Sequence, residues 1–181
     1  MSRLRIFEDT APLTTRIDTV DGAQVARHLE ATGVRFERWG AKAELAANAD
    51  QEAVIAAYRR DVDRLMSESG YTSVDVVRMV PDHPQRVDLR AKFLNEHTHA
   101  EDELRFFVEG AGLFYLHMKH DVYAVLCERG DLIGVPANTT HWFDMGSRPR
   151  FAAIRLFTNP DGWIAHFTGS DIAQRFPKFD E

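Results

Sequence analysis

A succession of short apolar runs between Tyr71 and Phe157 constrains the fold of this 181-residue chain more than any other feature. The runs are rich in β-branched and aromatic residues, and Gly, Pro, Asn and Asp separate them at strand-plus-turn intervals. They are S-V-D-V-V-R-M-V, A-K-F-L-N-E-H-T-H, L-R-F-F-V-E-G, G-L-F-Y-L-H-M, V-Y-A-V-L-C-E, D-L-I-G-V-P, T-H-W-F-D-M-G and R-F-A-A-I-R-L-F. This spacing predicts an antiparallel β-sandwich or barrel rather than alternating β and α units.

The first half of the chain instead reads as mostly helical. Asp21 is placed to cap a short helix through Leu29 that Gly33 would stop, and 45–48 is a weaker helical turn. The strongest pattern predicts one helix from Asp50 to a C-terminal cap at Gly70. Its apolar positions follow the three-to-four spacing of a buried face: Val54, Ile55, Tyr58, Val62, Leu65 and Met66.

These patterns combine into a mainly β fold with an N-terminal helical layer. We expect a single domain over 1–181, because the length suits one buried core. Within it, helices of 21–70 would cover an open face of a barrel formed by 71–160, and the tail 161–181 would pack back as short helix and loop.

Composition limits the location and the partners. The net charge is −6, and the absence of a basic stripe argues against nucleic acid. Cys127 is the only cysteine, which excludes an internal disulfide and suits the cytoplasm. No apolar run approaches the roughly 20 residues of a membrane span, and the N-terminal sequence lacks the apolar stretch of a signal peptide. We expect a cytoplasmic monomer.

Three histidines and one carboxylate carry the chemistry. His97, His99 and Glu103 lie in N-E-H-T-H-A-E-D-E, and His141 lies in P-A-N-T-T-H-W. Imidazole and carboxylate suit iron, nickel, cobalt or manganese. An octahedral ion with four protein ligands keeps two positions for a substrate, whereas a structural tetrahedral zinc would be closed by the same four.

The spacing of these residues requires a bend. His97 and His99 share one face of a strand, but a straight strand would carry Glu103 about 20 Å from His97 at roughly 3.3 Å per residue. We therefore expect a bend at 100–102 and a new strand beginning at Glu103. A helix would also bring His99 and Glu103 together at i and i+4, but the β-rich residues that follow disfavour it. His141 would come from a strand across the barrel.

Further candidates surround these four residues. Arg105 follows Glu103 by two positions, so it shares the interior face, where its charge would stabilise an anion. Arg155 is a second inward candidate. Phe93, Phe143 and Trp163 could line an apolar slot for a methylthio tail, although a place in the core is the simpler explanation for each. Two further features suggest no site: H-M-K-H at 117–120 suits a hairpin end and Cys127 suits the core.

The combined motifs resemble the cupin superfamily, a metal-containing jelly-roll barrel. The first cupin motif is filled by His97, His99, Glu103 and Gly110, and the second by Gly130, Pro136 and His141. The departures are Ala91 for the leading glycine of motif one, and Asn138 and Met145 for the second glycine and final asparagine of motif two. None of the three positions supplies a metal ligand.

A closer resemblance, to the bacterial acireductone dioxygenase family, runs through nearly the whole chain. It rests on G-V-R-F-E-R-W at 33–39, V-I-A-A-Y at 54–58, K-F-L-N-E-H-T-H at 92–99, E-L-R-F-F-V-E-G-A-G-L-F at 103–114, H-W-F-D-M-G at 141–146 and G-W-I-A at 162–165. The resemblance implies an acireductone substrate of methionine salvage, 1,2-dihydroxy-3-keto-5-methylthiopentene, cleaved by O2. It also implies one Fe(2+) or Ni(2+) per chain. The iron form would give 4-methylthio-2-oxobutanoate and formate, and the nickel form methylthiopropionate, formate and CO.

The same resemblance implies roles for individual residues. Arg105 would help to form the substrate dianion, Glu96 would assist metal loading and Asp102 would relay conformational changes. Two alternatives stay open: another cupin dioxygenase or isomerase, and a non-enzymatic metal or ligand sensor. Such sensors normally carry a DNA-binding segment, and no basic helix-turn-helix pattern is visible here.

Overall fold

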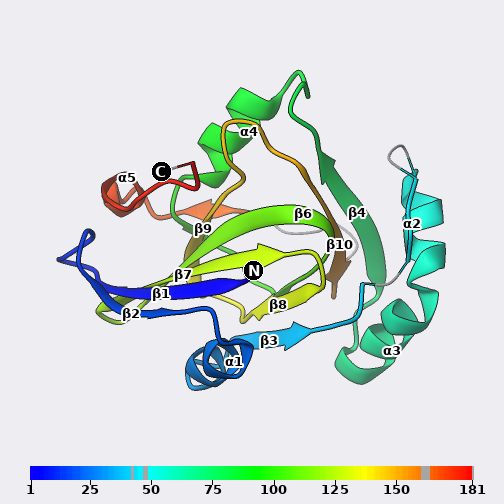
Figure 1. Ribbon diagram of the computed structural model, residues 1–181, viewed down its shortest axis with the longest axis horizontal. Helices are drawn as coiled ribbons and strands as arrows, with labels where there is room; N and C mark the ends of the chain where they lie inside the picture. Colours follow the sequence, from blue (N-terminus) through cyan, green and yellow to red (C-terminus); the bar gives the residue numbers. More distant parts are fainter. Residues whose placement is uncertain (42, 47–48, 160–163, 181) are drawn as a thin grey trace.

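The computed structural model describes residues 1–41, 43–46, 49–159 and 164–180, and antiparallel strands dominate it (Figure 1). The strands are β1 (Arg3–Glu8), β2 (Thr15–Thr19), β3 (Arg35–Arg38), β4 (Ser73–Met79), β5 (His97–Thr98), β6 (Glu103–Met118), β7 (Asp121–Glu128), β8 (Asp131–Val135), β9 (Thr140–Asp144), β10 (Phe151–Phe157) and β11 (His166–Phe167). The predicted mainly β, antiparallel architecture is therefore confirmed.

Strand β6 joins two groups of strands. Its first half pairs with β8 and β10, and its second half pairs with β7 and β9. The strand changes partners around Gly110, whose φ of +66° is left-handed. A Cβ at Gly110 would lie 1.8 Å from the carbonyl oxygen of Arg150, so only glycine fits this position. The two strands predicted on either side of Gly110 are thus one bent strand.

The five helices are α1 (Gly22–Glu30), α2 (Gln51–Ala57), α3 (Arg59–Ser69), α4 (Arg86–Phe93) and α5 (Ile172–Arg175). The predicted helix after Asp21 is confirmed, since the Asp21 carboxylate accepts from the backbone N–H groups of Ala23 and Gln24. None of the helices in the described part of the chain is long and apolar enough to cross a membrane.

The prediction of one continuous helix from Asp50 to Gly70 was wrong. Tyr58, at φ −115°, separates α2 from α3, and its ring packs edge-on against Phe106 with centroids 5.2 Å apart. The predicted cap is confirmed, because Gly70 ends α3 at φ +69°. Packing against the sheet, which the helical period does not encode, accounts for the break.

Two other expectations from the sequence were also wrong. The N-terminal half contains β1, β2 and β3 besides helices, and β1 alternates exposed Arg3 with buried Leu4. The run from Ala91 to His99 is not one strand, because α4 continues to Phe93 and only His97 and Thr98 form β5. The residues of α4 favour a helix and all stay at least partly exposed, so no β packing overrides that preference.

The helices cover outer surfaces of the β structure. Helices α2 and α3 lie beside β4, and α1 lies next to β3 (Figure 1). Leu104 and Phe106 of β6 pack against Val54 and Val62 of α2 and α3 in one apolar cluster. Because side chains alternate along a strand, this outward packing directs Glu103, Arg105 and Phe107 into the interior. The C-terminal tail packs back through α5, as predicted, against Phe7 and Trp142.

Candidate metal centre

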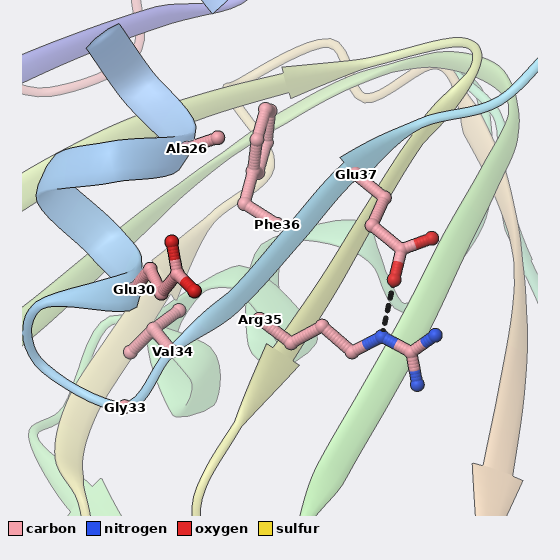
Figure 2. A pocket seen from close by; sticks show the side chains of 7 residues that line it. All are labelled: Ala26, Glu30, Gly33, Val34, Arg35, Phe36 and Glu37. Carbon is pink, nitrogen blue, oxygen red and sulfur yellow. Dashed lines mark hydrogen bonds and ion pairs between the residues drawn. The ribbon is translucent and has the colours of Figure 1, made fainter. Parts of the chain in front are cut away.

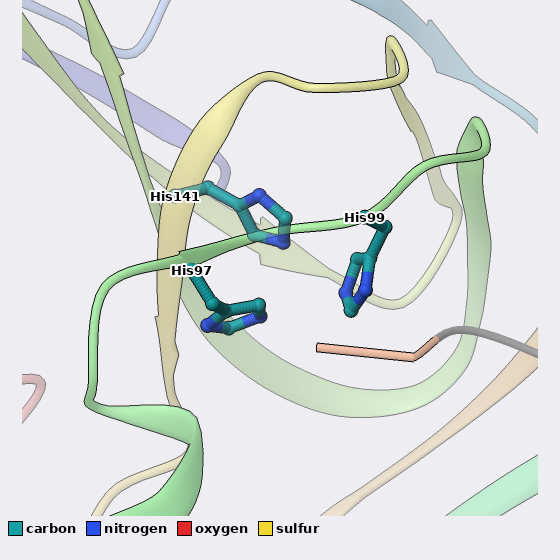
Figure 3. A group of neighbouring side chains, drawn as sticks. All are labelled: His97, His99 and His141. Atoms are coloured by element: carbon teal, nitrogen blue, oxygen red, sulfur yellow. The ribbon is translucent and has the colours of Figure 1, made fainter. Parts of the chain in front are cut away.

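Three buried histidines point toward one another (Figure 3). Strand β5 supplies His97, the residue after it supplies His99, and β9 supplies His141. Their candidate ligand nitrogens all lie within 4.8 Å of one another. His97 pairs directly with His141 across β5 and β9, so His141 comes from the neighbouring strand and not, as predicted, from across the barrel. The sequence contained no signal for this pairing, since β5 has only two residues.

Each imidazole is oriented by a backbone carbonyl. Nδ1 donates to Asn95 O at 2.7 Å in His97, to Ile164 O at 2.9 Å in His99 and to Thr139 O at 2.8 Å in His141. A carbonyl oxygen only accepts, so Nδ1 carries the proton in all three rings. The lone pair is then on Nε2 in each ring, which is the state that a metal ligand requires.

Glu103 completes the group of donors. The chain bends at 100–102, as predicted, and Glu103 opens β6. Its Oε2 lies 3.0 Å from His141 Nε2 and 3.4 Å from His99 Nε2. Bonds of about 2.1 Å to a common ion separate neighbouring ligand atoms by roughly 3 Å. Glu103 therefore lies at ligand spacing from two of the histidines, His141 and His99, beside the group of three histidines whose ligand atoms all lie within 4.8 Å of one another.

Burial and charge set the protonation states. Burial, together with the nearby His141, lowers the pKa of His97 from 6.5 to about 4. Burial alone would raise the pKa of the Glu103 carboxyl, but the positive charge of the adjacent Arg105 holds that pKa well below its ordinary value. Near neutral pH the site thus offers a neutral His97 imidazole and an ionised Glu103 carboxylate.

Arg105 lies inside the same site. Its Nε is 2.6 Å from Glu103 Oε1, and its side chain is 9% exposed. The guanidinium carbon lies 5.2 Å and 5.0 Å from the ring centroids of Phe114 and Phe143, within the range of cation–π attraction. Burial lowers the pKa of Arg105 although Glu103 opposes the shift. An arginine nevertheless keeps its charge near neutral pH.

Arg155 stands directly opposite Arg105 in the register of β10 and β6. Its Nε and Nη2 donate to the two carboxylate oxygens of Asp75 at 2.8 Å and 2.5 Å. Both arginines border a cavity of about 100 Å³ at the histidines, lined by Lys92, Phe93, His97, His99, Arg105, Arg155, Ala165 and Phe167. Lys92 and Phe167 were not anticipated, because α4 and β11 were not expected there.

The three aromatic residues that were predicted to line an apolar slot do not all border the cavity. Phe93 borders the cavity, whereas Phe143 is 2% exposed and packs in the core against Phe93 and Phe114. Trp163 lies outside the described residues.

Asp102 and Glu96 are near the histidines in sequence but make other contacts. Asp102 Oδ1 accepts from the backbone N–H of Ala137 at 2.8 Å, which ties the bend to the loop before β9. Glu96 is 4% exposed and binds His117 Nδ1 at 2.8 Å and Thr168 Oγ1 at 2.6 Å.

The run 117–120 and Cys127, the two features that suggested no site, lie where they were expected. Lys119 lies in the hairpin turn between β6 and β7 at φ +60°. His117, near this turn, is partly buried and contacts Glu96 through Nδ1. Cys127 is fully buried, and burial raises the pKa of its thiol well above the ordinary value. A thiol in that state is a core group, not a nucleophile.

A larger cavity, of about 400 Å³, lies between α1 and β3 (Figure 2). It is lined by Ala26, Glu30, Gly33, Val34, Arg35, Phe36 and Glu37. Arg35 and Glu37 pair with each other there at 2.6 Å. The cavity at the histidines is smaller but contains the converging donors, so chemistry and not volume selects the candidate site.

Known proteins are similar to this chain in sequence and in fold. The model of the ARD/ARD' family matches residues 3–165. An acireductone dioxygenase of Parvibaculum lavamentivorans is 61% identical over 180 residues, covering 99% of this chain and 98% of that protein. One of Stenotrophomonas maltophilia (strain K279a) is 59% identical over 179 residues, covering 99% and 97%.

A solved structure supports the same relationship. It is the acireductone dioxygenase from Bacillus anthracis with a cadmium ion in its active centre, 27% identical to this chain. The two superpose with a TM-score of 0.80 over 92% of this chain and 98% of the other. This similarity confirms the predicted cupin jelly-roll fold.

Proposed function

We propose that His97, His99, Glu103 and His141 together hold one Fe(2+) or Ni(2+) ion. The premise is that this chain belongs to the ARD/ARD' family and is an oxidoreductase of the acireductone dioxygenase type. The observation that carries the proposal is the convergence of Nε2 atoms on Glu103 Oε2, at 3.0 Å and 3.4 Å for His141 and His99. The cadmium ion in the active centre of the Bacillus anthracis relative supports a divalent metal.

The proposed substrate is 1,2-dihydroxy-3-keto-5-methylthiopentene, cleaved by O2 in methionine salvage. An iron-loaded protein would form 4-methylthio-2-oxobutanoate and formate, and a nickel-loaded protein methylthiopropionate, formate and CO. The names of the relatives support the acireductone class and favour a dioxygenase over an isomerase or a sensor. The bound ion would supply Lewis acidity and a template for the enediol and O2.

The charge of the cavity suits a substrate that loses protons. Arg105 and Arg155 lie opposite each other, and exposed Lys92 stands at the border of the cavity. Asp75 holds the guanidinium of Arg155 in place, so this charge needs little reorganisation when substrate binds. We assign to Arg105 the stabilisation of the enediolate, which lowers the pKa of the substrate, and to Arg155 the binding of the anion.

Apolar groups on the same cavity suit the methylthio tail. Phe93, Ala165 and Phe167 border the cavity beside the histidines and could exclude water from that part of the substrate. Phe143 would support Phe93 from the core, their ring centroids being 6.3 Å apart. Trp163 stays a proposal from the sequence.

Asp102 and Glu96 are assigned accessory roles. The bond of Asp102 to Ala137 N links the bend before Glu103 to the loop before His141, which suits a residue that relays movement between ligands. Glu96 stands next to His97 and would assist metal loading without being a ligand. The single domain, the monomeric state and the cytoplasmic location stay predictions from the sequence.

Removal of a single imidazole tests the metal site. We expect His97→Ala and His141→Ala to lose bound metal and turnover, because three donors remain and Glu103 is left partly uncompensated. His120→Ala is the matched control, since the side chain of His120 is 95% exposed at a hairpin turn. Metal content after dialysis and O2 consumption with the enediol are the measurements. Full metal content in the two site variants would refute the proposal.

A further inference from the structure

Segment 164–168 touches the histidine cluster at two points. The carbonyl oxygen of Ile164 accepts from Nδ1 of His99 at 2.9 Å. Phe167 pairs with His97 between β11 and β5, and the two ring centroids lie 5.8 Å apart. The segment therefore fixes the ring of one candidate ligand and covers the ring of another.

Apolar burial does not hold this segment in place. Ile164 is 64% exposed and Phe167 is 50% exposed, and β11 consists of only two residues. Burial stabilises an apolar side chain in proportion to the surface that it removes from water, and these two side chains keep half or more of their surface exposed. Polar contacts must supply much of the attachment.

Thr168 makes the polar contacts that follow β11. Its backbone N–H donates to the carbonyl oxygen of Glu96 at 3.1 Å, and its hydroxyl donates to Glu96 Oε2 at 2.6 Å. A hydroxyl bond to an ionised carboxylate is short and strong compared with a bond between neutral groups. The other carboxylate oxygen accepts from His117 Nδ1 on β6 at 2.8 Å, so the acceptor is itself held in place.

We propose that Thr168 is a positioning residue for the metal site. Its hydroxyl fastens segment 164–168 to the buried carboxylate of Glu96, and this attachment keeps the Ile164 carbonyl on His99 and the Phe167 ring on His97. Thr168 forms these hydrogen bonds with Glu96 and is not among the described residues that line the cavity at the histidines. The inference rests on the proposed metal site and extends it to a residue that orients a ligand through the backbone.

The test uses cobalt(II) as the probe metal, because its visible absorption reports on the ligand geometry. Thr168→Val removes the hydroxyl at nearly constant volume, and Thr168→Ser retains it. Thr32→Val is the matched control, because Thr32 also donates its hydroxyl, at 2.6 Å to Leu29 O, but at the end of α1. The measurements are the cobalt spectrum, the rate of cobalt release to a chelator, and deuterium exchange of the amides of 164–168.

We expect Thr168→Val to release cobalt about tenfold faster, at the lower end of the ~10–100-fold effects of losing an outer partner of a metal ligand. Its spectrum should change and its 164–168 amides should exchange faster, whereas Thr168→Ser and Thr32→Val should match the parent protein. Because coupling between two sites is reciprocal, cobalt should slow exchange of the same amides in the parent protein.

An unchanged spectrum and release rate in Thr168→Val would overturn the inference, even if that variant unfolds more easily. A serine variant as impaired as the valine variant would also overturn it. If Thr168→Val fails to fold, Thr168→Ala takes its place and is judged by the same three measurements. Failure of the parent protein to bind cobalt would refute the metal site itself, which is a distinguishable result.

Discussion

His141 Nε2 lies 3.0 Å from Glu103 Oε2, although the ring proton of His141 is already donated from Nδ1 to Thr139 O. A neutral imidazole in this tautomer presents a lone pair to an ionised carboxylate, and two acceptors at that distance repel each other. A cation between them removes the repulsion. The contact therefore favours binding of a metal ion.

We predict that Glu103→Gln lowers metal affinity by more than the roughly 10–100-fold cost of losing an outer partner of a ligand. The amide keeps the shape of the side chain but removes the negative charge that faces His141 and His99. Equilibrium dialysis against nickel measures the change. Glu109→Gln, on the same strand and paired with Arg78 at 2.7 Å, is the control and should bind nickel normally. Equal affinity of the two variants would contradict the assignment of Glu103 as a ligand.

Arg105→Met is expected to slow turnover by about 10²–10³, the effect of removing one preorganised donor to a developing oxyanion. Without the guanidinium the enediol ionises less readily, so the acidic limb of the kcat/KM profile should move to higher pH. Oxygen consumption measured across the pH range tests this. Arg150→Met, where the side chain is 74% exposed, should leave the profile in place. An unshifted acidic limb in Arg105→Met would exclude a role in substrate ionisation.

The lowered pKa of His97 predicts a pH-dependent stability of the metal-free protein. The folded value is about 4 and the ordinary value is 6.5, so the unfolded chain binds more protons between these limits. The free energy of unfolding should be fully retained above pH 6.5 and fall as the pH drops toward 4, by at most about 1.4 kcal/mol per pH unit from this group. Urea unfolding at stepped pH measures the slope, and His97→Gln should reduce it. The same slope in both proteins would contradict the shift.

Gly110→Ala should lower the free energy of unfolding by more than about 3 kcal/mol, which is the size of effect that a severe core clash produces. Two causes add: a left-handed backbone at φ +66° and a Cβ placed 1.8 Å from Arg150 O. Gly70→Ala separates them, because Gly70 has φ +69° with nothing within 4 Å of the added Cβ. This control should lose only about 1–2 kcal/mol, the cost of the left-handed conformation. Equal losses on urea unfolding would show that the bend in β6 does not depend on close backbone approach.

The sequence predicted those parts of the site that depend on local geometry. The spacing of His97, His99 and Glu103 required a bend, and strand alternation directed Arg105 inward; the structure has both features. The β-rich runs after Tyr71 likewise predicted the antiparallel architecture, because the period of two and the turn residues are local signals.

Long-range pairing accounts for the features that the sequence did not predict. The pairing of β5 with β9 and with β11 involves one or two residues, too few for a periodic signal. The carbonyl of Ile164 acts on His99 through the backbone, which carries no side-chain signature. At Tyr58, contact with Phe106 overrides a continuous helical pattern.

Metal removal followed by reloading, with analysis of the products, tests the central claim most directly. With the enediol and O2, the metal-free protein should be inactive and the nickel-loaded protein should release CO, formate and methylthiopropionate. The iron-loaded protein should give formate and 4-methylthio-2-oxobutanoate without CO. Oxygen consumption by the metal-free protein, or the same products with both metals, would contradict the account.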